Sequence, residues 1–288
     1  MMRGHSIGVI TDEISQELAD ALDLAEEFSL DGVEIRSVWD RGPFALTMED
    51  AKRIRDLTRA RGLSVCGISA PFYKCAIKDP EERKAHLAGL EHCIRLAELW
   101  ETPVIRGFSF WKEGSFAELL PQIAEAYQAP AEMAARHGIT LALESDPSVN
   151  AVNGGQLAQL VDAVGSPAVQ ALWDPGNDLY APLPERPYPE GYEKLRGRIA
   201  HVHLKDARRT DGQTEGCCFG AGEVDWKGQL TALERDGYQG WLVMETHYRL
   251  ASVLSEEDLK RPGGAAFSAG GYEPTRRCLA ALRRMLEG

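Results

Sequence analysis

The sequence alternates short apolar runs with longer amphipathic stretches, and this alternation restricts the possible folds more than any other feature. Eight of the apolar runs have the length and composition of strands that are buried on both faces. They are SIGVI (6–10), GVEIR (32–36), LSVCGIS (63–69), PVIRGF (103–108), ITLALE (139–144), VQALWD (169–174), IAHVH (199–203) and GWLVME (240–245). Continuous apolar runs of this kind indicate a parallel sheet rather than an antiparallel one.

Helical patterns fill the intervals between these runs. Residues 47–62 begin with a capping-box pattern, in which Thr47 is followed three residues later by Asp50. Repeated β/α units without a break in composition predict an α/β fold, a single-domain (β/α)8 TIM barrel over residues 1–288. A doubly wound open sheet fits less well, because no glycine-rich phosphate loop follows the first run. The long stretch after the eighth run, about 247–273, is either a cover for an active site or a surface insertion.

Composition excludes several classes of protein. The net charge of −12 argues against a nucleic-acid-binding surface, which needs clustered Lys and Arg. No run approaches the roughly 20 apolar residues of a membrane helix, and the first residues lack the apolar region of a signal peptide. We expect a cytoplasmic protein with free thiols that contacts neither nucleic acid nor membrane. The oligomeric state stays open, with a homo-oligomer as one alternative.

Four of the apolar runs end in a side chain that can bind a metal. These side chains are Glu144, Asp174, His203 and Glu245. A single residue of this kind is more often a helix cap or a loop ion pair, but four on consecutive strands favour one shared ion at the carboxyl end of the barrel. Three carboxylates with one imidazole favour Mn²⁺, with Mg²⁺, Co²⁺, Fe²⁺ or Zn²⁺ as alternatives. His201, two residues before His203, points the same way along the strand, and we expect it in a core layer of the barrel.

Other polar and aromatic residues near strand ends are candidates for substrate contacts. Glu34 can bind a substrate hydroxyl group or pair with Arg36. Trp111 can wall a sugar pocket or pack against other aromatic side chains. His247 can contact substrate or orient Glu245, which lies two residues before it.

Lys205 lies two residues after His203 and has two interpretations that we weigh equally. A lysine that reaches inward just above the strand can bind a substrate oxygen or donate a proton to a leaving hydroxyl group. Alternatively, it is an ordinary surface lysine that pairs with Asp206.

Several motifs resemble the xylose isomerase-like TIM barrels, the broad group of sugar phosphate isomerases and epimerases. They are GVEIR, LALES, WDPGN, HVHLKDAR, FGAGEVDW (219–226) and VMET. The resemblance spans nearly the whole chain. The HxHLKD element is more similar to the inosose dehydratase branch than to the free-ketose epimerases.

The resemblance implies that the four strand-end residues bind the metal and that two of them, Glu144 and Glu245, also act as an acid/base pair. It also implies substrate contacts for Arg209, although Arg208 beside it is an alternative. Many members have a histidine three residues after the metal aspartate, and this sequence has Asn177 there. The three-zinc DNA-repair branch needs additional histidines, and Asn177 replaces one of them, which disfavours a nuclease.

We therefore expect a divalent-metal-dependent isomerase or epimerase that acts on a ketose, sugar phosphate or related polyol through an enediolate. The expected catalytic residues are Glu144, Glu245 and Lys205. The expected substrate-binding residues are Arg209, Asn177, Glu34, Trp111 and His247. The alternatives are a metal-dependent dehydratase of a keto-cyclitol of the inosose type and a non-catalytic sugar-binding barrel. The sequence does not choose the substrate, because isomerisation, epimerisation and dehydration share one first half-reaction.

Overall fold

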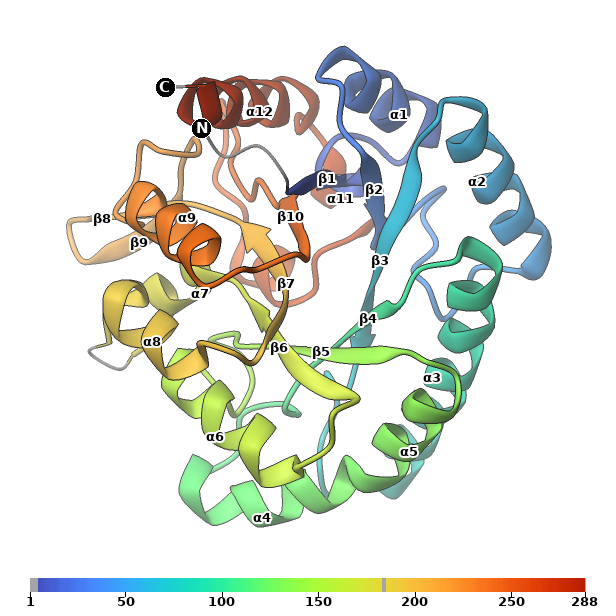
Figure 1. The fold of residues 1–288 in the computed structure, drawn as a ribbon, viewed down its shortest axis with the longest axis vertical. Helices are drawn as coiled ribbons and strands as arrows, with labels where there is room; N and C mark the ends of the chain where they lie inside the picture. Colours follow the sequence, from blue (N-terminus) through green and yellow to red (C-terminus); the bar gives the residue numbers. More distant parts are fainter. Residues whose placement is uncertain (1–4, 183–184, 288) are drawn as a thin grey trace.

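Eight parallel strands close into a barrel in the computed structural model, which describes residues 5–182 and 185–287 (Figure 1). The strands are β1 (Ser6–Ile10), β2 (Gly32–Ile35), β3 (Ser64–Phe72), β4 (Val104–Gly107), β5 (Thr140–Glu144), β6 (Val169–Trp173), β7 (Ile199–Leu204) and β10 (Trp241–Met244). Because β1 pairs in parallel with both β2 and β10, the barrel sheet has no free edge. The predicted TIM barrel is confirmed, and each of the eight apolar runs coincides with one of its strands, although β3 and β7 extend beyond their predicted runs.

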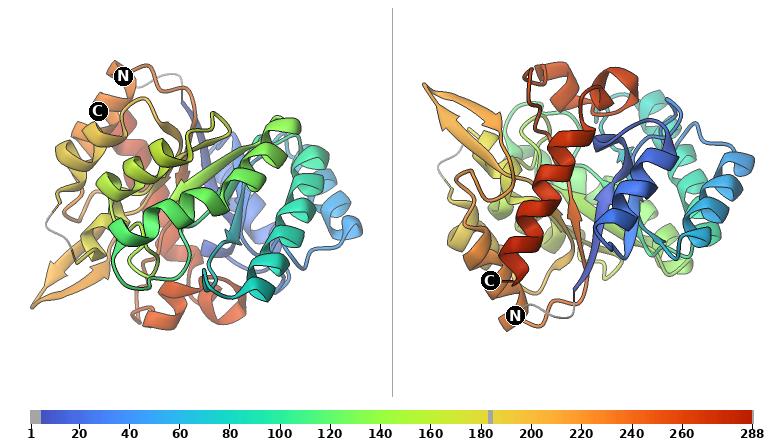
Figure 2. Two further views of the ribbon diagram at one scale, coloured as in Figure 1. Left: turned by 90° about the horizontal axis from the view of Figure 1, so that it is seen from below. Right: turned by 90° about the horizontal axis from the view of Figure 1, so that it is seen from above.

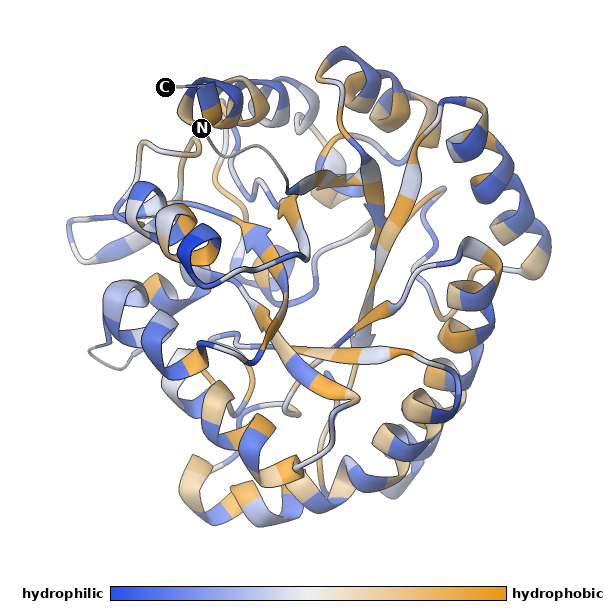
Figure 3. Ribbon diagram, in the orientation of Figure 1, coloured by the Kyte–Doolittle hydropathy of each residue, from blue (hydrophilic) through white to orange (hydrophobic). Residues whose placement is uncertain are grey.

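A ring of helices surrounds the barrel, and Figure 3 shows hydrophilic residues on these helices and mainly hydrophobic residues along the strands. The helices are α1 (Leu18–Glu27), α2 (Met48–Ala60), α3 (Pro80–Trp100), α4 (Phe116–Ala126), α5 (Gln128–Arg136), α6 (Gly154–Val164), α7 (Pro175–Tyr180), α8 (Tyr192–Leu195), α9 (Trp226–Arg235), α10 (Glu256–Lys260), α11 (Gly264–Ser268) and α12 (Tyr272–Glu287), with short turns η1 (Thr11–Glu13) and η2 (Pro187–Gly191). Among these described helices, none has the length and apolar character needed to cross a membrane.

Helix α2 shows how local sequence and packing agree. The Thr47 hydroxyl accepts the backbone N–H of Asp50 at 3.1 Å, and the Asp50 carboxylate accepts the backbone N–H of Thr47 at 2.9 Å. This is the predicted capping box, which satisfies backbone donors that a helix leaves unpaired at its start. Ala51, Ile54 and Thr58 recur at helical spacing and are buried, so this face of α2 packs on the barrel.

The side chains inside the barrel change from apolar to charged toward the carboxyl ends of the strands. Among the described residues, two small apolar clusters lie apart from the main core, one of Ile10, Cys66 and Val243 and one of Val104, Ala142 and Leu172. Side chains two residues apart in a strand point to the same side. The positions directly above four of these apolar residues are therefore Arg106, Glu144, Asp174 and Glu245. The strand sequences thus place charged groups at one mouth of the barrel.

The hairpin that follows β7 was not predicted from the sequence. It pairs β8 (Ala207–Thr210) with β9 (Gln213–Gly216) in antiparallel fashion. Its turn residues, Asp211 and Gly212, both have positive φ angles, of 51° and 78°. An Asp-Gly pair between short polar strands is a recognised signal for this type of turn, and it was overlooked.

The long segment after β10 contains helices α10 and α11 rather than loop alone. Figure 2 shows these two helices and the β8–β9 hairpin at one end of the barrel, with both chain termini at the other end. The helices therefore lie at the mouth that carries the charged side chains.

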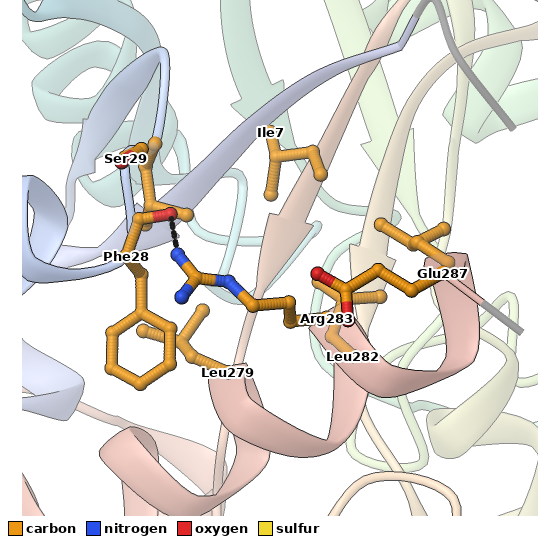
Figure 4. Close-up of a pocket in the computed structure, with 9 residues that line it drawn as sticks. Ile7, Phe28, Ser29, Leu279, Leu282, Arg283 and Glu287 are labelled. Atoms are coloured by element: carbon orange, nitrogen blue, oxygen red, sulfur yellow. Dashed lines mark hydrogen bonds between the residues drawn. The ribbon is translucent and has the colours of Figure 1, made fainter.

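A groove of about 310 Å³ lies outside the barrel, between α12 and the segment after α1 (Figure 4). It is lined mainly by apolar side chains, and Arg283 donates a hydrogen bond of 2.7 Å to the carbonyl of Phe28. Ile7, at the start of β1, also lines it. The groove thus lies near the amino ends of the strands, which in barrels of this kind contribute to stability rather than to chemistry.

We expect Ile54→Ala to lower the free energy of unfolding by about 2–5 kcal/mol, because it removes buried methyl groups from the α2 interface. Lys52→Ala, on the exposed face of the same helix, is the matched control and should change stability by less than about 0.5 kcal/mol. Equilibrium denaturation in urea measures both values. Equal losses in the two variants would contradict the packing described for α2.

Candidate metal centre

Four ligand-type side chains converge at the carboxyl ends of β5, β6, β7 and β10. Glu144, Asp174, His203 and Glu245 are all buried, and each offers an atom that lies within 4.8 Å of the others. His203 Nδ1 is 3.6 Å from Glu144 Oε1 and 3.3 Å from Glu245 Oε2. The barrel order β10-β7-β6-β5 makes these strands consecutive neighbours, and this adjacency brings their ends together.

Asp174 directs one oxygen toward this cluster because its other oxygen caps a helix. Its Oδ1 atom accepts the backbone N–H groups of Gly176 at 2.9 Å and Asn177 at 3.3 Å, at the start of α7. Its Oδ2 atom is buried, lacks a hydrogen bond, and lies 2.5 Å from Lys205 Nζ. The sequence left open whether Asp174 caps a helix or binds a metal. The structure allows both, because one oxygen caps α7 and the other is available as a ligand.

His203 is oriented by Glu34 in a way that leaves one ring nitrogen free. Its Nε2 atom lies 3.1 Å from Glu34 Oε1, so it donates its proton there in the neutral ring. Its Nδ1 atom is buried and has no hydrogen-bond partner. A carboxylate behind the distal nitrogen of a histidine is the usual support for a metal-binding imidazole. This unpaired nitrogen fits a metal ligand.

Glu34 also binds His201, whose Nε2 atom is 2.7 Å from Glu34 Oε2. Ser69 donates its hydroxyl to the same carboxylate. His201 is fully buried inside the barrel, as expected for a core layer. Both Glu34 oxygens are therefore engaged by protein groups, and this carboxylate orients His203 from below.

Two other groups of potential ligands overlap with this cluster, and neither has room for an ion. Glu34, His201 and His203 already bond directly to one another. Between Glu13 and Glu245 lies the guanidinium of Arg36, at 2.7 Å from Glu13 and 2.6 Å from Glu245. The four strand-end residues differ because two of their ligand atoms, Asp174 Oδ2 and His203 Nδ1, lack a hydrogen bond, although Lys205 Nζ lies close to Asp174 and Glu245.

The buried charges around the cluster do not balance. Six buried carboxylates belong to the network, namely Asp12, Glu13, Glu34, Glu144, Asp174 and Glu245. Four buried Arg and Lys side chains face them, namely Arg36, Arg106, Lys205 and Arg249. With all six carboxylates ionised and the histidines neutral, two negative charges remain uncompensated among these described residues. A divalent cation would supply the missing charge.

The pKa values respond to this excess of negative charge. Burial, together with Glu245 and Glu144, raises the pKa of Asp174 to about 8 against the opposing effect of Lys205. Burial alone would lower the pKa of His203, but Glu34 and Glu245 raise it well above its usual value. Both shifts favour uptake of a proton into the cluster, which is how buried groups reduce an uncompensated charge.

Lys205 belongs to the cluster rather than to the surface. Its Nζ atom lies 2.5 Å from Asp174 Oδ2 and 2.8 Å from Glu245 Oε2. The alternative partner, Asp206, is engaged by backbone instead, because it accepts the N–H groups of Gly220 at 2.9 Å and Gly222 at 3.0 Å. The conspicuous HLKD and FGAGEVDW motifs therefore meet through Asp206, which fixes the loop between them.

The structure brings three of the five predicted substrate-binding residues against the cluster, and the first of them, Glu34, contacts His203 as described above. Asn177 donates from Nδ2 to Glu144 Oε1 at 3.0 Å. His247 Nε2 lies 3.4 Å from Glu245 Oε1, and burial lowers the pKa of His247 to about 3.

The remaining two lie farther out. Trp111 follows β4 and lines a separate cavity at the mouth, where Lys260 Nζ lies 4.8 Å from the centre of its ring. Arg209 lies on the hairpin, half exposed, where it donates to the carbonyl of Leu179 at 2.9 Å. The structure thus does not bring Arg209 to the cluster, and its substrate contact stays a prediction.

The sequence analysis assigned several groups no role in holding the glutamates in place. Arg36 donates to Glu245 at 2.6 Å and also binds Asp12 and Glu13. Arg106 donates to Glu144 at 3.1 Å. Both arginines occupy the ends of strands, as the metal ligands do, so the same positional signal was available for them. Asp12 and Glu13 follow β1 directly in a short turn, so their position beyond a strand end was a signal of the same kind.

The arrangement is suited to chemistry beside an anion-stabilising centre. It combines a site for a cation, two carboxylates held in fixed positions, and a lysine ammonium within reach of both Asp174 and Glu245. Carboxylates near a metal can move protons, and an ammonium can bind or protonate an oxygen.

Comparisons with known proteins agree with this geometry. Residues 22–267 match the model of a family described as the xylose isomerase-like TIM barrel. The chain is 28% identical over 139 residues to an inosose dehydratase from Yersinia enterocolitica. That match covers 43% of this chain and 46% of the relative, so the aligned part spans about half of each protein.

Solved structures share the fold at lower identity. A D-allulose 3-epimerase from Methylomonas sp., in complex with D-allulose, has a TM-score of 0.75 and 17% identity, over 98% of this chain and 97% of that chain. A probable 3-DHS dehydratase from Bacillus anthracis has a TM-score of 0.72 and 16% identity, over 96% of this chain and 98% of that chain. The family match covers most of the sequence, and the closed barrel agrees with it. The chain belongs to the xylose isomerase-like TIM barrel family.

Proposed function

We propose that this protein is a divalent-metal-dependent isomerase or epimerase that acts on a ketose, sugar phosphate or related polyol. The observation that carries the proposal is the convergence of three buried carboxylates on the unpaired Nδ1 atom of His203. The excess of buried negative charge supports a divalent ion, with Mn²⁺ first among the candidates. The shared fold of an epimerase that binds D-allulose supports a sugar as substrate.

A divalent ion held by the four strand-end residues would polarise a carbonyl oxygen and stabilise the negative charge that develops when a neighbouring C–H proton is removed. The protein supplies the proton-transfer groups. Glu144 and Glu245 are ionised, because Arg106 overcomes the effect of burial on the pKa of Glu144, and Lys205 does so for the pKa of Glu245. An ionised carboxylate can accept a proton at once.

The two glutamates lie on different sides of the site. Glu144 ends β5 and Glu245 follows β10, and strands β6 and β7 lie between these two in the barrel. One carboxylate can therefore take a proton from one face of a bound substrate while the other returns a proton to the opposite face. This division of roles is what epimerisation requires.

Dehydration of a keto-cyclitol is the second candidate, and Lys205 is the observation that favours it. Its ammonium lies 2.8 Å from Glu245 and can protonate a β-hydroxyl group as that group leaves. The partial sequence match to inosose dehydratases supports the same outcome. Proton removal beside the carbonyl is common to both candidates.

We expect Glu34→Gln to weaken Mn²⁺ binding by about 10–100-fold, because the amide orients His203 less strongly than the carboxylate does. Glu98→Gln is a matched control, since Glu98 pairs with the exposed imidazole of His137 at 2.7 Å. Isothermal titration calorimetry with Mn²⁺, after removal of metal by a chelator, measures the dissociation constant for both variants. A wild-type protein that binds no Mn²⁺ would refute the metal centre.

We expect Glu144→Gln and Glu245→Gln each to lower proton exchange by at least about 100-fold, because an amide cannot take up the substrate proton. The measurement is deuterium uptake from D2O into a panel of ketoses, sugar phosphates and inososes, followed by NMR. Glu98→Gln again serves as control and should exchange at the wild-type rate. Metal-loaded wild-type protein that binds a sugar without exchange would instead support a non-catalytic barrel.

Lys205→Met distinguishes the two reactions. If the product is dehydrated, the variant should still exchange substrate deuterium but should form product at least about 100-fold more slowly, because the leaving hydroxyl has lost its acid. Mass spectrometry detects loss of water directly. A product of unchanged mass that forms in the wild type, with little effect of the substitution, would exclude the dehydratase.

A further inference from the structure

A second cavity, of about 330 Å³, opens beside the metal cluster at the same mouth of the barrel. Arg36 and Arg106 line it, and these arginines donate to Glu245 at 2.6 Å and to Glu144 at 3.1 Å. One guanidinium layer therefore separates the cavity from the proposed proton-transfer carboxylates. The cavity and the cluster are therefore neighbours that share these two arginines.

The lining of the cavity is mainly apolar and carries four basic side chains, each of which also has an acidic partner outside the lining. The basic residues are Arg36, Lys74, Arg106 and Arg261, and the cavity is also lined by Phe44, His86 and Trp111. Among the described residues that line it, none is acidic. The property of the lining that favours an anion is therefore not its net charge but the N–H donors that its basic side chains leave unused.

Lys74 is one of the buried cations that line the cavity. Its Nζ atom donates to Asp146 Oδ2 at 2.9 Å and to the carbonyl of Lys260 at 2.9 Å, and it lies 4.3 Å from the centre of the Phe108 ring. An ammonium has three N–H donors, and these contacts use two of them. The third remains for a ligand.

Arg106 also has donors to spare. Its side chain donates to Glu144, to the carbonyl of Ser69 at 3.1 Å and to the carbonyl of Ala70 at 3.4 Å. A guanidinium carries five N–H donors, so two are left. Its planar geometry is suited to the paired oxygens of a carboxylate or phosphate. Arg36 differs, because Asp12, Glu13, Glu245 and His247 engage all sides of its guanidinium.

Arg261 approaches the cavity from the segment after β10. Its guanidinium lies 5.4 Å from the centre of the Trp111 ring, and its ion pair is an exposed contact of 3.3 Å with Glu257. Exposed pairs of this kind contribute little to stability, so Arg261 is free to turn toward a ligand. The Lys260 carbonyl beside it already binds Lys74, which ties this segment to the cavity.

We propose that the substrate carries an anionic group, a carboxylate or a phosphate, and that Lys74, Arg106 and Arg261 bind it in this cavity. The proposal rests on the proposed function, because the reacting carbons are placed at the metal cluster. Trp111 and Phe44 cover the carbon skeleton between the two ends. The anionic group then fixes which carbons lie between Glu144 and Glu245, and so determines the position of proton removal.

Direct binding tests the cavity without turnover. Inorganic phosphate and glycolate are titrated into Mn²⁺-loaded protein, and we expect Lys74→Met and Arg261→Gln each to weaken the tighter of the two by about tenfold or more. Lys78→Met is the matched control, since Lys78 lies on the same loop but is exposed. Arg261→Gln changes an exposed residue, so its result stands even if Lys74→Met does not fold. The better-bound probe identifies the group as phosphate or carboxylate. No binding of either anion, or equal weakening in Lys78→Met, would overturn the proposal.

Deuterium exchange separates this proposal from the proposed function. We expect sugar phosphates or sugar acids to exchange, with KM raised in Arg261→Gln and kcat nearly unchanged. Exchange that is equally fast with a neutral ketose and its phosphorylated or acidic counterpart would overturn the proposed anion-binding cavity. It would leave the metal-dependent reaction intact. Anion binding that depends on Lys74, without exchange of any substrate, would support the cavity and refute the reaction.

Discussion

The balance of buried charge at the carboxyl mouth of the barrel is the constraint on which the rest of this structure depends. Carboxylates removed from water need partners, since an unpaired buried charge is strongly destabilising. Arg36, Arg106 and Lys205 supply part of that partnership, and their geometry fixes Glu144 and Glu245. What remains uncompensated has the magnitude of one divalent cation. Proton uptake by Asp174 and His203, whose pKa values are raised, would reduce this charge, and a bound divalent cation would compensate it instead.

The support of this mouth comes from elements that do not themselves face a ligand. Glu34 on β2 orients His203 on β7 across the barrel interior. Asp206 gathers four backbone N–H groups and so holds the loop that precedes α9. These residues occur in the most recognisable motifs of the chain. Their physical role is to place other side chains, which explains why such motifs identify the family but leave the substrate undecided.

The two candidate binding regions at the mouth lie on different parts of the barrel. The strands from β5 to β10 carry the carboxylates of the candidate metal cluster and His203, while the arginines that line the neighbouring cavity lie at the ends of β2 and β4. Arg106 belongs to both, because it binds Glu144 and also faces the cavity. An anionic substituent bound to Arg106 would therefore lie next to Glu144, one of the proposed proton-transfer groups. Through this side chain, binding of the substituent would be coupled to the proposed reaction.

The sequence by itself determined the barrel and the four strand-end residues. Most of the strands are continuous apolar runs, and the four ligand-type side chains lie at the ends of such runs. Spacing along the chain was therefore sufficient to predict both. The hairpin β8–β9 was also signalled, through Asp211 and Gly212, but its strands are too short and polar for hydrophobic periodicity to mark them. Helices α10 and α11 were not predicted from the sequence, because each has only five residues, too few to establish a helical period.

Only the tertiary structure decided which charges meet. Lys205 could equally have paired with Asp206, its neighbour in sequence, and the fold directs it to Asp174 and Glu245 instead. Arg36 reaches Glu245 across 209 positions of the chain, and Lys74 meets the carbonyl of Lys260 across 186. Contacts of this kind depend on the closure of the barrel, which joins β1 to β10 and brings both halves of the chain to one mouth. Local sequence specifies the strands and their ends, whereas the electrostatic partners exist only once the ring has closed.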